Sequence, residues 1–358
     1  MVIENVGPSE ARLLISFALA MSVAGALTPV ARRVGLAFDL VDRPQGWKSH
    51  LTPTPYLGGA AVLAGVTTGS LLGPDLRTVA LVLGAMLVLS VTGTLDDAVH
   101  LHVGWRLLIE LLAGCFLWAV GLGWRLDGPD LMNLVLTCVW VVGVINAFNI
   151  IDLMDTLASS VLIASAVGLA VLAQLEGDTN TAVMSIAVGA ATLGFLPFNA
   201  KRSHIFLGDG GTMALGFLVA AIAMLALHGA EQDSQLAVVA PLLFWVPLAD
   251  AVWRALERIT AGVSIMTAGH DSLADSLQRH VVTPGRVGLL LAAAQAVGST
   301  VAITSIRSGA GVEMIASVMI ACATACATAV GSWAILVGLR GVLSGARIRR
   351  VRALLLRE

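Results

Sequence analysis

The chain has 358 residues, of which 57% are hydrophobic and only 12% are charged, and its mean hydropathy is +0.89. This composition excludes a soluble globular protein and indicates an integral membrane protein. The formal net charge of −2 gives no support for a nucleic-acid partner, which would favour a basic surface.

Apolar runs long enough to cross a membrane as helices recur along the whole chain. We therefore predict an all-α, polytopic membrane helix bundle that forms one domain over residues 1–358. About eleven transmembrane helices are expected, and the first is expected to be retained because acidic residues precede it where a signal peptide would be basic. The predicted cores are residues 12–31, 57–73, 78–95, 107–123, 131–150, 158–175, 182–198, 212–228, 236–254, 285–305 and 314–339.

The distribution of basic residues predicts the orientation of this bundle. With the N-terminus outside and the C-terminus in the cytoplasm, only four of the 21 Lys and Arg residues lie on the outer side, namely Arg12, Arg77, Arg125 and Arg307. Such a bias is what the positive-inside rule requires. The inner loops are then residues 32–56, 96–106, 151–157, 199–211 and 255–284.

The first inner loop contains the stretch "KSHLTPTPYLGG". Lys48 and His50 supply positive charge, and Pro53 and Pro55 make the approach to the next helix rigid. These residues are candidates for binding an anionic substrate. Taken alone, this stretch is explained equally well by proline and glycine residues that only shape a loop.

The second inner loop begins with two adjacent carboxylates, Asp96 and Asp97, directly after the apolar run "LVLSVTGTL". Adjacent carboxylates at a membrane boundary repel one another unless a cation lies close. A divalent metal ion, or a cluster of Lys and Arg, would remove the repulsion. The alternative is a solvated helix end without a chemical role.

The stretch "NAFNIIDLMDTL" places Asn146, Asn149, Asp152 and Asp155 at intervals of three residues. On a helix, the last three of these would share a face about 120° wide. Ionisable groups at membrane depth usually mark a functional site, and four polar residues in phase favour that interpretation over a helix end that is merely solvated.

The fourth inner loop ends in "FLGDGGT". The glycines around Asp209 let the backbone approach a bound group, and Asp209 offers a hard oxygen ligand to Mg²⁺. A tight turn between two membrane helices would also use glycine. Together, the carboxylates of three loops and the basic residues Lys48, Lys201 and Arg202 indicate a site for Mg²⁺ and phosphate at the inner membrane surface.

In four blocks the sequence resembles the polyprenyl-phosphate N-acetylhexosamine-1-phosphate transferase family. The blocks are Lys48 and His50 through Gly58 and Gly59, the Asp96 and Asp97 pair, "NAFN" with Asp152 and Asp155, and "FNAKRSHIFLGD". The resemblance implies transfer of a sugar 1-phosphate, with N-acetylglucosamine (GlcNAc) 1-phosphate as the first candidate, from a UDP-sugar to a polyprenyl phosphate with release of UMP. It also implies an Mg²⁺-dependent site, with Mn²⁺ as an alternative, on the cytoplasmic face of a bacterial inner membrane.

The resemblance also implies roles for single residues. Asp209 and Asp97 would hold the metal ion, and Asp96, Asp97, Asp152 and Asp155 are the candidate catalytic residues. Candidates for substrate binding are Lys48, His50, Asn146, Asn149, Asn199, Arg279 and His280. The expected partners are the UDP-sugar, the polyprenyl phosphate and membrane lipids, and a homodimer is left open.

Two departures from the family pattern keep other functions open. Leu153 and Thr156 replace glycines, and the last inner loop, "GHDSLADSLQRH", has Ser272, Ala274 and Asp275 where bacterial members carry a His-x-His-His motif. A phospho-N-acetylmuramoyl-pentapeptide (MurNAc-pentapeptide) transferase-like activity is one alternative. A catalytically silent paralogue that binds the nucleotide sugar or lipid is another, and a secondary transporter is a third.

Overall fold

A computed structural model of the chain describes residues 7–43, 52–152, 154, 156–200, 204–228, 239–260, 262, 272 and 284–308. The chain divides into two compact units, Met1–Gly309 and Ala310–Glu358, and all described residues belong to the first. The prediction of one domain over the whole chain therefore stays a prediction.

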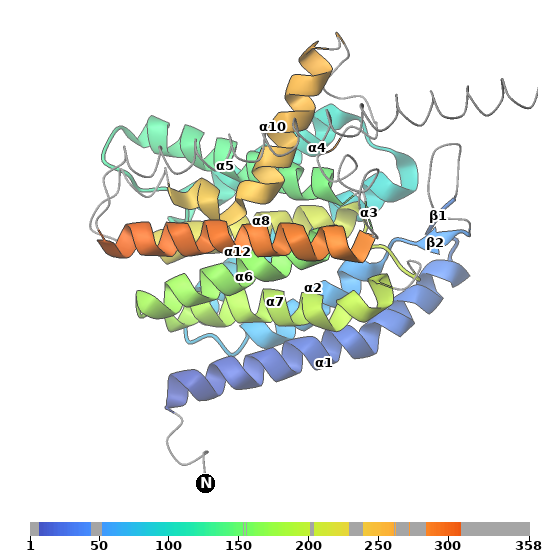
Figure 1. The fold of residues 1–358 in the computed structure, drawn as a ribbon, viewed down its shortest axis with the longest axis horizontal. Coiled ribbons are helices and arrows are strands. Elements are labelled where there is room, and N and C mark those ends of the chain that lie inside the picture. The colour runs from blue at the N-terminus through green and yellow to red at the C-terminus, as the bar shows by residue number, and fades with distance from the viewer. Residues whose placement is uncertain are drawn as a thin grey trace, which may run out of the picture. The chain divides into compact units, whose positions relative to one another are not determined.

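Helices make up most of the described residues, as the predicted all-α class requires (Figure 1). They are α1 (Pro8–Ala37), α2 (Gly58–Ser70), α3 (Leu76–Val99), α4 (Val103–Ala119), α5 (Asp130–Ile151), α6 (Leu157–Leu175), α7 (Thr179–Asn199), α8 (Asp209–Leu227), the 3-10 helix η1 (Ala240–Phe244), α10 (Trp245–Thr260) and α12 (Pro284–Ser308). One small departure is an antiparallel pair of two-residue strands, β1 (Val41–Asp42) and β2 (Thr54–Pro55), which the sequence did not predict.

Seven of the described helices are long and apolar enough to cross a membrane: α1, α3, α5, α6, α7, α8 and α12. Helix α2, with 13 residues, and helix α4, with 17 residues, are shorter than the roughly 20 residues that a straight span needs. The predicted core 314–339 lies outside the described residues. The expected number of about eleven spans and the expected orientation therefore stay predictions, whereas a multi-pass membrane bundle is confirmed.

The predicted apolar core 236–254 differs from the structure over its described part. The chain forms η1 and then α10, which continues to Thr260, beyond the predicted start of the last inner loop at residue 255. Asp250, Arg254 and Arg258 are buried on one face of α10, whereas Val252 and Leu256 are exposed on another. The spacing of four residues between the buried polar side chains makes α10 an amphipathic helix instead of a uniformly apolar span.

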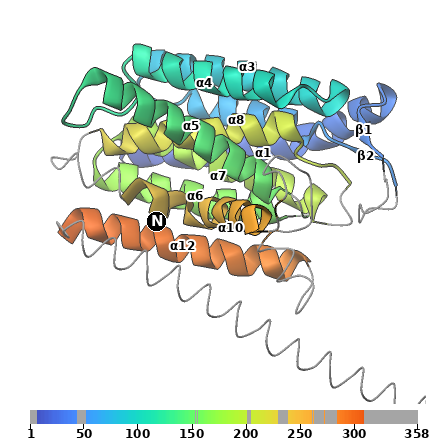
Figure 2. The ribbon, with the colours of Figure 1, turned by 90° about the horizontal axis from the view of Figure 1, so that it is seen from above.

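Helix α8 lies at the centre of the bundle, and 94% of the residues in its most apolar 18-residue stretch are buried. Figure 2 shows α8 between α3 and α4 on one side and α6 and α7 on the other. A helix that is apolar on every side is stable in such a position. Small residues bring its neighbours close, because a Cβ atom on Gly93 of α3 would collide with the backbone carbonyl of Asp209. This packing fixes the first turn of α8 against the last turns of α3.

The predicted inner loops are shorter than expected, because the helices extend into them. Helix α3 continues to Val99 and α8 begins at Asp209, so Asp96, Asp97 and Asp209 lie in terminal helical turns. The same is true of residues 32–37 in α1, residues 103–106 in α4 and Asn199 at the end of α7. Polar residues extend helices in this way when they bond to free backbone groups at the ends.

Candidate active site

Three carboxylates meet where the end of α3 faces the start of α8. Asp97 Oδ2 accepts a hydrogen bond from the backbone N–H of Asp209, at 2.8 Å. The N-cap residue of α8, Gly208, has φ of +76° and has no side chain of its own to cap the helix. Asp97 therefore caps α8 from a neighbouring helix, and its negative charge lies at the positive end of the α8 dipole.

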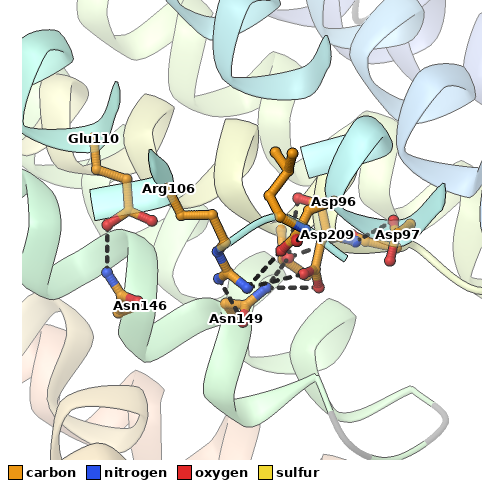
Figure 3. A network of polar contacts seen from close by, with 10 residues as sticks. Asp96, Asp97, Arg106, Glu110, Asn146, Asn149 and Asp209 are labelled. Carbon is orange, nitrogen blue, oxygen red and sulfur yellow. Dashed lines mark hydrogen bonds and ion pairs between the residues drawn. The ribbon is translucent and has the colours of Figure 1, made fainter. Parts of the chain in front are cut away.

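Arg106 of α4 joins two of these carboxylates (Figure 3). Its Nη1 lies 2.7 Å from Asp96 Oδ2 and 3.2 Å from Asp209 Oδ2, and its Nη2 donates to Asn149 Oδ1 at 3.2 Å. The turn before α4 places this side chain, because Asp96 Oδ1 also accepts from the backbone N–H of Leu101. Asp96 thus fixes both the turn and the guanidinium.

Asn149 of α5 orients Asp209 from the other side. Its Nδ2 donates to Asp209 Oδ1 at 2.8 Å and to Thr212 Oγ1 at 3.1 Å. Each oxygen of Asp209 therefore has one donor, an amide on Oδ1 and a guanidinium on Oδ2. The structure brings Asn149, Asp96, Asp97 and Asp209 together, and their roles as site residues stay predictions.

The cluster carries more negative than positive charge. Asp96, Asp97 and Asp209 face a single described cation, Arg106. Asp96 and Arg106 are largely shielded from solvent, with 8% and 18% of their side-chain surfaces exposed, whereas Asp209 is 31% exposed. Excess negative charge on a partly open surface favours binding of a further cation.

Asn146 and Glu110 form a second contact between α4 and α5, one helical turn deeper than the Arg106–Asn149 pair (Figure 3). Asn146 Nδ2 donates to Glu110 Oε2 at 2.5 Å. Glu110 is fully buried, and within the described residues its Oε1 has no hydrogen-bond partner. In this structure Asn146 therefore contacts Glu110, and its predicted role in substrate binding stays a prediction.

Asn199, at the end of α7, is buried and bonded to the protein backbone. Its Oδ1 accepts from Thr156 N–H at 2.7 Å, and its Nδ2 donates to the Ile205 carbonyl at 3.2 Å. These bonds connect the start of α6 with the segment that leads to α8. Asn199 thus has a clear structural role here, beside the substrate-binding role that remains a prediction.

The expected helical stripe through Asp152 and Asp155 is wrong in its geometry, because α5 ends at Ile151. Asp152 is the C-cap residue, and Thr156 has φ of +70°, which a continuing helix does not allow. The turn to α6 is held by the bond between Asn199 and Thr156. Asp152 lies at the end of the helix, and Asp155 lies outside the described residues.

The other predicted site residues also lie outside the described residues: Lys48, His50, Arg279 and His280, together with Lys201, Arg202, His270, Ala274 and Asp275. Ser272 is described and buried, with 1% of its surface exposed. The roles of the basic loop residues stay predictions.

Sequence reasoning missed Arg106 and Glu110 as members of the site. The positive-inside pattern places Arg106 only as a basic residue at the end of the second inner loop, residues 96–106. A signal was available in "VGWRLLIELLAG", where Arg106 and Glu110 lie four residues apart in an otherwise apolar helix. Charged residues at one-turn spacing in such a helix share a face and indicate a functional or packed interior surface.

The chemistry of the cluster fits a hard divalent cation. Its carboxylate and amide oxygens are the ligand atoms that Mg²⁺ prefers, and the excess negative charge would be reduced by it. Among the described residues, no group of three His, Cys, Asp or Glu side chains is already arranged as a metal centre. Two of the carboxylates, Asp96 and Asp209, instead bond to Arg106, so a cation bound by Asp209 would have to compete with that side chain.

Tyr56 lies beside the cluster, between β2 and α2. Burial, and then the negative charges of Asp97 and Asp39, raise the pKa of the Tyr56 phenol above its usual value. The phenol therefore stays protonated at neutral pH and remains a hydrogen-bond donor.

Comparison with known proteins finds related sequences that include this part of the chain. The model of glycosyl transferase family 4 matches residues 79–227, which contain Asp96, Asp97, Arg106, Asn149 and Asp209. A probable undecaprenyl-phosphate N-acetylglucosaminyl 1-phosphate transferase from Bacillus subtilis is 30% identical over 263 residues, which cover 69% of this chain and 72% of that protein.

Two further relatives have similar names. An undecaprenyl-phosphate alpha-N-acetylglucosaminyl 1-phosphate transferase from Escherichia coli is 27% identical over 290 residues, covering 76% of this chain and 78% of that protein. A decaprenyl-phosphate N-acetylglucosaminephosphotransferase from Mycobacterium leprae is 28% identical over 265 residues, covering 63% and 67%. The chain therefore belongs to the polyprenyl-phosphate N-acetylhexosamine-1-phosphate transferases of glycosyl transferase family 4.

Proposed function

We propose that the protein transfers GlcNAc 1-phosphate from UDP-GlcNAc to a polyprenyl phosphate and releases UMP. The reaction would take place at the cytoplasmic face of a bacterial plasma membrane and would begin the synthesis of a lipid-linked glycan of the cell envelope. The observation that carries the proposal is the cluster of Asp96, Asp97 and Asp209 at adjoining ends of membrane helices, in which Arg106 bonds to Asp96 and Asp209. The names of the relatives support the choice of acceptor and sugar.

The proposed reaction is a phosphoryl transfer. An oxygen of the acceptor phosphate forms a bond to the β-phosphorus of the UDP-sugar, and the bond from that phosphorus to the bridging oxygen breaks. UMP leaves with the bridging oxygen and its electron pair. Because the acceptor phosphate is already an anionic nucleophile, direct attack needs no covalent intermediate on the protein.

The residues of the cluster have distinct tasks in this proposal. A bound Mg²⁺, or Mn²⁺ in its place, would reduce the negative charge of the diphosphate, with Asp209 and Asp97 as its protein ligands. Asn149 keeps Asp209 oriented, and Asp97 keeps the first turn of α8 in place. Asp96 holds Arg106, whose positive charge lies close enough to the cluster to attract an anionic substrate.

The position of the cluster favours an enzyme over a secondary transporter. Transporter sites lie near the midplane of the membrane, between broken helices. Here the carboxylates lie in the last turns of α3 and the first turn of α8. A substrate delivered from water and an acceptor phosphate at the membrane surface could both reach such helix ends.

The proposed activity is tested with the purified protein, polyprenyl phosphate and a panel of UDP-sugars. UMP release with UDP-GlcNAc, and little with UDP-MurNAc-pentapeptide, is the expected result. Preference for the pentapeptide donor would support the alternative transferase activity. Absence of UMP release with every donor, while a UDP-sugar still binds, would support the silent paralogue.

The replaced histidine motif provides a second test between an active transferase and a silent paralogue. Asp275 adds negative charge where family members carry imidazoles, so it should weaken the binding of a diphosphate. We expect the combined changes Ser272→His, Ala274→His and Asp275→His to raise the rate of UMP release. Because Ser272 is buried, a double variant at residues 274 and 275 is the control for disturbed packing.

A further inference from the structure

Arg106 bonds to Asp209, one of the two carboxylates that the proposed cation needs. Its Nη1 bonds to Asp96 and Asp209 at 2.7 and 3.2 Å, and its Nη2 bonds to Asn149. The contact with Asp209 uses one of the two lone pairs of Oδ2. A carboxylate oxygen that binds a metal ion at about 2.1 Å cannot also hold a guanidinium in the same direction.

Charge repulsion strengthens this conflict. A guanidinium and a divalent cation within a few ångströms repel one another, and the repulsion is large where solvent is limited. Only 18% of the Arg106 side chain is exposed. Arg106 and a cation bound by Asp209 would therefore have to separate.

Glu110 offers Arg106 a second partner. It lies one turn further along α4, is fully buried, and is bonded through Oε2 to Asn146. Its other oxygen, Oε1, has no hydrogen-bond partner within the described residues. A buried carboxylate oxygen without a partner costs free energy, and a guanidinium from the same helix face would supply one.

We propose that Arg106 is a displaceable counter-cation, which neutralises Asp96 and Asp209 in the metal-free protein and moves toward Glu110 when a divalent cation binds. This inference rests on the divalent cation of the proposed function. Its consequence is that the protein without substrate binds the cation weakly. A substrate diphosphate, which brings further negative charge, would then strengthen the binding of the cation.

The direct test measures Mn²⁺ binding by electron paramagnetic resonance, with the full-length protein in nanodiscs of zwitterionic lipid and no substrate. Arg106→Gln should lower the Mn²⁺ dissociation constant about tenfold, because the competing charge is gone. Arg106→Lys keeps the charge and should lie between wild type and Arg106→Gln. Arg77→Gln is the matched control, because this exposed arginine lies at the opposite end of α3, and it should leave the constant unchanged.

The role of Glu110 is tested by combining two substitutions. Glu110→Gln should weaken Mn²⁺ binding about threefold in the wild-type background. In the Arg106→Gln background the same change should have a much smaller effect, since no guanidinium remains to be received. Equal effects in both backgrounds would show that Glu110 acts only through its own charge, and would contradict the proposed movement toward it.

Three outcomes would overturn the inference. Unchanged or weaker Mn²⁺ binding in Arg106→Gln would contradict the competition between Arg106 and the cation. In that case, Mn²⁺ binding and UMP release by the wild type would still support the proposed function. Absence of Mn²⁺ binding in every variant would show that the cluster does not bind a divalent cation, and would contradict both this inference and the proposed role of the cation. If Arg106→Gln is unstable without metal, thermal unfolding replaces the binding assay. Addition of Mn²⁺ should then raise the melting temperature of Arg106→Gln more than it raises the melting temperature of the wild type. A smaller rise would contradict the inference.

Discussion

Replacing Asp209 by Asn should abolish activity without unfolding the protein. Asparagine keeps the size of the side chain and an oxygen that can accept from Asn149 at the present 2.8 Å. The lost ion pair with Arg106, 3.2 Å long and 31% exposed on the Asp209 side, is worth about 0 to 1 kcal/mol. The lost negative charge at the start of α8 costs about 0.3 to 1 kcal/mol more.

Reduced repulsion offsets part of this loss, because Asp97 and Asp96 no longer face a third carboxylate. We therefore expect the free energy of unfolding to change by less than about 2 kcal/mol. The rate should fall far more, by at least ~100-fold, which is the scale lost when one positioned electrostatic group is removed from a reaction centre.

Two measurements on the same preparation check this prediction. UMP release gives the rate, and thermal unfolding in detergent or nanodiscs gives the stability. A variant that melts near the wild-type temperature and retains a tenth or more of the wild-type rate would refute the reasoning. Asp75→Asn is a suitable control, since Asp75 caps the other end of α3, away from the cluster, through bonds to Arg77 and Thr78 N–H groups.

Further predictions concern the neighbours of Asp209. Asp97→Asn and Asp96→Asn should each slow UMP release by more than ~100-fold. Near-normal rates in both variants would support the alternative that this pair is a solvated helix end without a chemical role. Asp96→Asn should also lower the melting temperature, because Arg106 loses its shortest ion pair. Asn199→Ala should destabilise the protein by about 1 to 3 kcal/mol through two unpaired backbone groups, as measured by thermal unfolding. Asn149→Ala should instead weaken UDP-sugar binding by a similar free energy, and calorimetry that finds the affinity unchanged would exclude it from the site.

The sequence predicted the class of fold well because hydrophobicity is a strong signal over twenty residues. Helix α8 illustrates this, since an unbroken apolar run directly predicts a buried or membrane-spanning helix. The amphipathic helix α10 was mistaken for an apolar span. Its buried Asp250 and Arg254 are the two charged residues of the predicted core 236–254, whose other residues are apolar.

The sequence predicted which residues gather at the site better than how they are held. Asp96 and Asp97 of α3, Asn149 of α5 and Asp209 of α8 come from three separate segments, and the structure brings them together. Helix boundaries were predicted least well. The carboxylates expected in loops lie in the terminal turns of helices, where Asp97 accepts a hydrogen bond from a free backbone N–H group. Partners across helices, such as Arg106 with Asn149, depend on the rotation and the depth of two helices, which one sequence does not specify.

The central claim is that the sugar and its phosphate move together to the lipid. The most direct measurement uses UDP-GlcNAc that carries one label on the β-phosphate and another on the sugar, with polyprenyl phosphate as acceptor. We predict that both labels enter the lipid product in equal amounts, together with one equivalent of UMP. Transfer of the sugar label without the phosphate label, with UDP as the released nucleotide, would contradict the account.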